Sequence, residues 1–126
     1  MSRVRWVEHG GRQIAWLDFA GIENPDDAYP VIEEARSFIA SQPEKSVLTL
    51  TDVTGSTFNA DLGRALWRLA RDNRPHVIAG AVIGIEGLQK DLFQLVTFVS
   101  RRPLQPFKTA DAAMDWLVAQ LPGGKR

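Results

Sequence analysis

The run Val77 to Ile83 constrains the fold most, because all seven of its positions are apolar or glycine. A strand without polar positions has both faces covered, which is typical of a parallel sheet lying between layers of helices. Ser46 to Thr51 is rich in β-branched residues and predicts a second interior strand, which ends at the polar cluster Asp52 to Ser56. The chain is therefore expected to form an α/β domain.

Two runs near the start of the chain predict an antiparallel pair of strands. Val4 to Glu8 and Gln13 to Phe19 are rich in apolar and aromatic residues, and His9 to Arg12 between them contains two glycines suited to a hairpin turn. Leu104 to Phe107 predicts only a weak edge strand, because prolines lie in it and beside it. Five strands are expected in all.

Four helices are expected from apolar stripes at helical spacing. Asn24 to Asp27 gives the start signal of the first, and Asn59 and Thr109 are the predicted caps of the second and fourth. The stripes are Ala28 to Ile39, Leu62 to Ala70, Leu88 to Val99 and Ala113 to Leu121. The order ββαβαβαβα predicts one domain over residues 1–122, with a mixed, mostly parallel five-stranded sheet, four helices and a flexible tail over 123–126.

Composition excludes several classes of function. The 126 residues include no cysteine, which rules out disulfides, zinc–thiolate sites and thiol nucleophiles. Fifteen basic and fifteen acidic residues balance, so no net field draws the protein to nucleic acid or to an anionic membrane. No apolar stretch is long enough to cross a bilayer or to form the core of a signal peptide. A soluble, cytoplasmic protein is expected.

Three phrases together resemble a known family. They are Ser46 to Gly55, Ala81 to Lys90 and Ala112 to Leu117. With the order of elements, they are similar to the STAS domain of bacterial anti-sigma-factor antagonists, and in particular to its SpoIIAA-like branch. The resemblance implies a compact domain that works by binding a partner or a ligand, with no established chemistry for the branch as a whole.

The resemblance also implies where a switch would lie. In anti-sigma-factor antagonists, a serine in an Asp-Ser-Ser-Gly stretch at a helix start is phosphorylated by the partner kinase. In this chain Ala60 to Gly63 aligns with that stretch, and Asp61 occupies the position of the serine that would accept the phosphate. A phosphorylation switch is therefore not expected. Asp61 is either a fixed negative charge that a partner recognises, or an acid that stabilises the helix because the helix dipole favours negative charge in the first turn.

The loop Asp52 to Asn59 is the first candidate binding segment, because ligands of open α/β sheets settle beyond the carboxyl ends of the strands. It offers the carboxylate of Asp52, the flexible Gly55, and hydroxyls including those of Thr54 and Ser56. These groups are able to bind a polar ligand or a partner's backbone. The same residue types also build turns and caps, and that interpretation stays open.

The segment Gly84 to Lys90 is the second candidate. Gly84, Gly87 and Lys90 surround an expected helix start, where backbone amides bind anions, but the spacing is not that of a phosphate loop. Glu86 opposes an anion, and a tight turn explains the glycines equally well. The sequence implies no cofactor.

Catalytic and metal chemistry find little support. His9 falls in the expected hairpin turn and His76 before a strand, at opposite ends of different elements. No nucleophile elbow is present, and the two separated histidines do not make a metal site. We therefore predict no catalytic residue and no metal ligand, and a protein that is not an enzyme.

The aromatic residues divide into two groups. Trp6, Trp16 and Trp116 are expected in the core. Trp67 lies off the apolar face of its helix, and Phe93 and Phe98 lie at the margin of theirs, so these three are candidates for an exposed patch that binds a partner or a second subunit. The alternative is that broad apolar stripes bury their margins.

The leading functional prediction is a regulatory, STAS-like protein-interaction module that uses the segment Asp52 to Asp61, with Trp67 as an anchor. The protein partner is unidentified, and a homodimer is an open alternative. The second hypothesis is a carrier for a lipid or another small apolar ligand, because the SpoIIAA-like grouping also resembles CRAL-TRIO domains. The helix Leu88 to Val99 would then cover the pocket.

Overall fold

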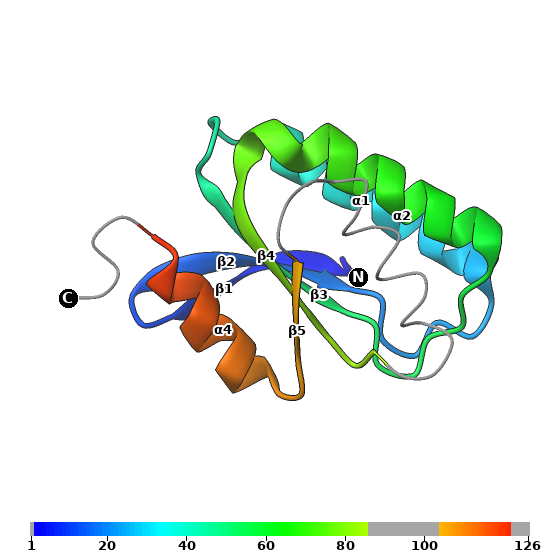
Figure 1. Cartoon of the computed structure of the whole chain (residues 1–126). Helices are drawn as coiled ribbons and strands as arrows, with labels where there is room; N and C mark the ends of the chain where they lie inside the picture. Colours follow the sequence, from blue (N-terminus) through cyan, green and yellow to red (C-terminus); the bar gives the residue numbers. More distant parts are fainter. Residues whose placement is uncertain (1, 86–103, 122–126) are drawn as a thin grey trace.

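The computed structural model describes residues 2–85 and 104–121 of the chain. They form a single α/β domain with one five-stranded sheet in the order β1-β2-β3-β4-β5 (Figure 1). The strands are β1 (Val4–His9), β2 (Arg12–Asp18), β3 (Val47–Asp52), β4 (Val77–Ile83) and β5 (Leu104–Phe107). β1 is antiparallel to β2, and the other neighbours are parallel, so the predicted mixed, mostly parallel sheet is confirmed.

Three α-helices lie in the described part of the chain, so the expected count of four is not matched there. They are α1 (Tyr29–Ala40), α2 (Ala60–Asn73) and α4 (Ala110–Ala119), and two short 3-10 helices, η1 (Pro25–Ala28) and η2 (Arg74–His76), precede α1 and β4. The other expected helix, Leu88 to Val99, lies outside the described residues, as do Phe93, Phe98 and the tail. The hypothesis of a lipid carrier depends on that helix, which would cover the ligand pocket.

The hairpin turn follows from its two glycines. Gly10 and Gly11 have φ angles of 59° and 77°, in the left-handed region that glycine adopts without steric cost. Two consecutive residues in this conformation match the twist of the flanking strands, and His9 pairs with Arg12 across the turn. The predicted hairpin is confirmed.

Local capping signals fix the helix starts. The side chain of Asn24 accepts a hydrogen bond from Asp26 N at 3.0 Å and starts η1, which leads into α1. Thr109 Oγ1 accepts from Ala112 N at 3.2 Å and caps α4, as predicted. Both side chains satisfy backbone N–H groups that have no partner inside the helix.

Helices cover both faces of the sheet. α1 and α2 lie side by side on one face, and α4 lies on the other (Figure 1). Successive residues of β3 serve opposite faces, since Val47 packs under α1 and α2 whereas Leu48 packs under α4. β4 also contributes buried residues to both clusters, which explains its apolar run. No helix among the described residues is both long and apolar enough to span a membrane.

Of the three tryptophans predicted to lie in the core, Trp6 differs most from the prediction. Trp6 is 39% exposed and rests against Phe38 of α1, with ring centroids 5.0 Å apart. It is exposed because β1 is an edge strand and α1 covers that edge only in part. Trp16 and Trp116 are half-buried and pack against the cluster under α4, so the prediction holds better for them.

Candidate functional site

Three loops meet at the carboxyl edge of the parallel strands. The loop after β2, the loop after β3 and the end of β4, where the third loop begins, are joined by backbone hydrogen bonds of 2.8 to 3.0 Å. These bonds run from Phe19 N to Asp52 O, from Gly21 N to Thr54 O, from Thr57 N to Ile22 O and from Val53 N to Ile83 O. The structure therefore brings the first predicted loop into a fixed position against its neighbours.

Asp52 and Ser56 shape this loop from within. Asp52 Oδ1 accepts from Thr54 N at 3.0 Å and from Thr54 Oγ1 at 2.6 Å, which closes a tight turn. Ser56 Oγ donates to Val53 O at 2.7 Å. The carboxylate and these two hydroxyls thus make local turn contacts, as the turn alternative predicted for these residue types.

Gly84 joins the end of β4 to this loop. Its φ is 86°, and a Cβ atom there would lie 2.5 Å from Thr54 N and 2.6 Å from Thr54 Cα. Only a residue without a side chain allows the two backbones to approach so closely. The first residue of the second predicted segment therefore meets the first segment. Gly87 and Lys90, the other residues of the anion-binding hypothesis, lie outside the described residues.

Asn59 and Asp61 occupy the start of α2. Asn59 Oδ1 accepts from Leu62 N at 2.8 Å, so the predicted cap is confirmed. The carboxylate of Asp61 pairs with the Arg64 guanidinium one turn along the helix and remains 75% exposed. Asp61 therefore presents a negative charge to solvent at the helix end where the backbone dipole favours one.

Removal of the α2 cap should weaken the domain measurably. Asn59→Ala leaves the Leu62 N–H without its side-chain acceptor, and we expect the free energy of unfolding to fall by about 1 kcal/mol. Urea denaturation followed by circular dichroism measures the loss. Asn59→Asp is the matched control, because its carboxylate accepts the same bond. A loss of equal size in both variants would show that the cap contributes little.

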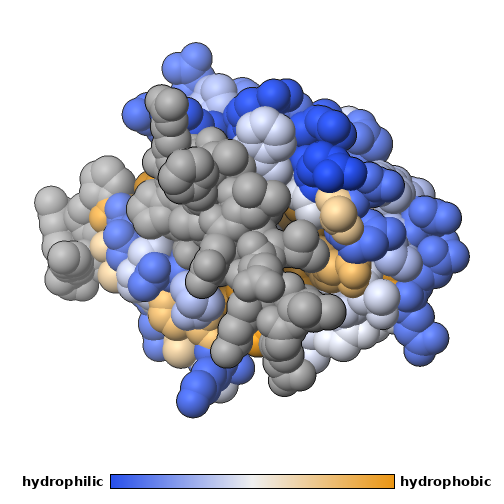
Figure 2. All heavy atoms as spheres, turned by 45° about the vertical axis from the view of Figure 1, so that its right-hand side comes forward, coloured by the Kyte–Doolittle hydropathy of each residue, from blue (hydrophilic) through white to orange (hydrophobic). Residues whose placement is uncertain are grey.

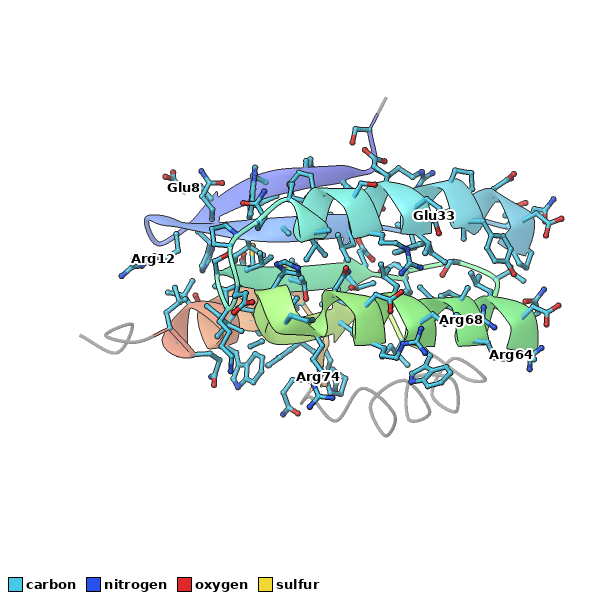
Figure 3. All side chains as sticks on the ribbon, turned by 90° about the horizontal axis from the view of Figure 1, so that it is seen from above. Glu8, Arg12, Glu33, Arg64, Arg68 and Arg74 are labelled. Carbon is cyan, nitrogen blue, oxygen red and sulfur yellow. The ribbon has the colours of Figure 1, made fainter. Side chains whose placement is uncertain are left out.

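Charged side chains of both signs project from the helix layer formed by α1 and α2. Arg64 and Arg68 project from the outer side of α2, and Glu33 projects from α1 beside it (Figure 3). Hydrophilic residues dominate the part of the surface that the helix layer forms (Figure 2). This layer therefore presents charges of both signs, which suits selective recognition more than binding of a polyanion.

Trp67 does not join the loop surface. It follows Asp61 by six residues on α2, which places the two side chains about 120° apart around the helix axis. Trp67 is half-buried, the guanidinium carbon of Arg71 lies 5.4 Å from the centroid of its ring, and its Nε1 is buried with no hydrogen-bond partner among the described residues. In the described part of the chain, the Trp67 side chain therefore points to a different side of α2 from Asp61, and the predicted anchor does not lie on the same surface as the segment Asp52 to Asp61.

The sequence interpretation missed the loop after β2. Phe19, Gly21 and Ile22 hold the neighbouring loop by backbone bonds, whereas the binding segments predicted from the sequence are Asp52 to Asn59 and Gly84 to Lys90. A signal existed, because a strand parallel to β3 ends at the same edge of the sheet. Gly21, with φ of 71°, marks a turn at that point.

The two histidines lie apart from this site. His9 Nε2 is 2.6 Å from Asp115 Oδ1 of α4, and His76 Nδ1 is 2.8 Å from Gln42 O. Both lie at the amino edge of the parallel strands, with different partners. Within residues 2–85 and 104–121, no group of three or more histidine, aspartate or glutamate side chains is placed to hold a metal ion.

Comparison with known proteins defines the fold. No protein-family model and no curated protein matches the chain. A structural match is the crystal structure of an uncharacterized protein of the DUF3478 family with a SpoIIAA-like fold, from Shewanella loihica PV-4. The TM-score is 0.66 at 16% sequence identity, over 90% of this chain and 91% of that chain. The domain has a SpoIIAA-like fold, which confirms the predicted resemblance at the level of the fold.

Proposed function

We propose that this chain is a non-enzymatic, STAS-like module that binds a partner protein through its carboxyl-edge surface. This surface consists of the loop Asp52 to Asn59 and the first turn of α2 with Asp61 and Arg64. The observation that supports the proposal best is the set of backbone hydrogen bonds that hold this exposed loop against the loop after β2 and the end of β4. A loop already fixed in one conformation loses little entropy when a partner binds.

The exposed groups on this surface suit a protein partner. Gly55 and Thr57 are exposed, so the backbone at Gly55 and the hydroxyl of Thr57 are accessible. Asp61 and Arg64 add one charge of each sign at the start of α2, which follows this loop. Such a surface offers polar contacts and a charge pattern that discriminates between partners, which is how protein interfaces obtain specificity.

A change of charge on this surface should weaken partner binding. Asp61→Arg reverses the charge of the exposed carboxylate. As a second variant, Thr57→Lys adds a cation to the loop, and the Thr57 backbone bond to Ile22 O remains available. We expect either variant to weaken binding by about tenfold or more. The measurement is affinity capture from an extract of the source organism, followed by calorimetric titration of the purified captured protein.

Glu44→Arg is the matched control. Glu44 is exposed on the loop between α1 and β3, at the opposite edge of the sheet, and its reversal changes the net charge by the same amount as Asp61→Arg. We expect it to bind like the native chain. A partner that binds both surface variants with unchanged affinity would refute the assignment of this surface.

A further inference from the structure

The outer edge of β1 carries backbone groups that β2 does not use. Asp18 N donates to Arg3 O at 2.9 Å, so Arg3 faces β2. The alternation of an antiparallel ladder then turns the N–H and C=O groups of Val4, Trp6 and Glu8 away from β2. Ser2 confirms this direction, since its hydroxyl accepts from Val4 N and donates to Val4 O. In the described part of the chain, no hydrogen-bond partner is found for the outward N–H and C=O groups of Trp6 and Glu8.

The two edges of the sheet differ in how they are protected. β5 is four residues long and contains Pro106, which lacks an N–H and prevents regular pairing at an edge. β1 has six residues, contains no proline and pairs with β2 without a bulge. It also carries Trp6, the only large hydrophobic side chain among the described residues that is exposed. An unprotected edge strand with an exposed tryptophan at its centre is suited to pairing with another strand.

From the unpaired backbone groups of β1 and the exposed Trp6, we infer that β1 pairs antiparallel with β1 of a second copy of this chain. The two copies then form a homodimer with a continuous sheet. A two-fold axis normal to the sheet keeps each sheet face on the same side in both copies. Residues that lie opposite each other must therefore come from the same face of β1, the face of Val4, Trp6 and Glu8 or the face of Arg5 and Val7.

One register uses every outward group of the strand. With the axis at Trp6, Trp6 lies opposite Trp6 of the partner subunit, and Val4 lies opposite Glu8 of the partner subunit. Shifting the axis by one residue pairs fewer of these groups within the strand. The Trp6 rings and the two Phe38 rings on which they rest then form one aromatic cluster over the α1 face of the joined sheets. Pairing at Val4 displaces the Ser2 hydroxyl from that residue's backbone.

Sedimentation equilibrium over a concentration series tests the dimer without any partner protein, so its outcome is independent of the proposed function. An interface of one strand per copy is small, and a concentration-dependent monomer–dimer equilibrium is expected. Trp6→Lys removes the central ring and adds an edge charge, and it should raise the dimer dissociation constant by about tenfold or more. Gln105→Lys adds the same charge to β5, the other edge strand, and should leave the constant unchanged.

Cysteine cross-linking tests the register, and the chain contains no competing thiol. Two copies of Trp6→Cys place their Cα atoms about 5.5 Å apart, within reach of a short bis-maleimide. Two copies of Glu8→Cys lie about 14 Å apart along the strands and should remain uncoupled. Circular dichroism verifies that each variant is folded. A native chain that stays monomeric at its highest soluble concentration, a dimer unaffected by Trp6→Lys, or coupling at Glu8 rather than Trp6 would overturn the inference.

Discussion

Gly84→Ala is expected to lower the free energy of unfolding by about 2–5 kcal/mol. Gly84 has a φ of 86°, and a left-handed backbone costs an alanine about 1–2 kcal/mol. The new Cβ would also lie 2.5 Å from Thr54 N and 2.6 Å from Thr54 Cα. These are backbone atoms, so no side-chain rotation relieves the overlap and the two segments must separate. Urea denaturation followed by tryptophan fluorescence measures the loss.

Gly55→Ala separates the two causes. Gly55 has a φ of 68°, but a Cβ there would meet no atom within 4 Å, so only the conformational cost of about 1–2 kcal/mol applies. The excess loss in Gly84→Ala then measures the close approach of β4 to the loop after β3. Equal losses at the two positions would mean that the overlap with Thr54 adds no cost, and that the close approach of β4 to the loop after β3 does not constrain residue 84.

The sequence predicted best those features that depend on near neighbours in the chain. The apolar run of β4 identified an interior strand because helices cover both of its faces. Asn59 and Thr109 identified helix starts because a cap bonds to an N–H only three residues away. The resemblance to SpoIIAA-like domains rests on three short sequence phrases and on the order of such local elements.

Features that depend on position in the sheet were harder to predict. Trp6 alternates onto the same face as the buried Val4, and its pattern therefore suggests the core. It is exposed because β1 lies at an edge, and the pattern of one strand does not reveal which strands occupy the edges. The contribution of Gly21 to the site escaped prediction for a similar reason, since its bond to Thr54 O joins residues far apart in the chain.

The sequence predicts where the residues of the candidate site lie better than it predicts what each residue does. Asp52, Thr54 and Ser56 do lie together at the carboxyl edge of the sheet, as the general rule for α/β folds predicts. Their composition, however, suits a turn as well as a binding loop, and the hydrogen bonds show that the Asp52 carboxylate holds the turn. These residues therefore act on the proposed surface by fixing the backbone that Gly55 and Thr57 expose.

The largest loss from a side-chain truncation is expected in Phe19→Ala, about 3–5 kcal/mol. Phe19 is 1% exposed and, among the residues that the structure describes, is the bulkiest fully buried side chain, in the cluster beneath α1 and α2. Its removal leaves a cavity that neighbours fill only in part. The bond from its backbone N to Asp52 O does not depend on the side chain, so the loop contact remains available.

Phe58→Ala removes the same ring from a position where it packs against the same cluster but is only half-buried, and a smaller loss of about 1–2 kcal/mol is expected. A domain of this size is stable by about 5–15 kcal/mol, so Phe19→Ala should shift the urea midpoint far more than Phe58→Ala does. The order of the two losses tests whether the fully buried Phe19 ring contributes more to this cluster than the half-buried Phe58 ring. If Phe58→Ala were the more destabilising variant, the packing of the loop before α2, and not the buried ring that ends the β2 segment, would hold this edge of the sheet together.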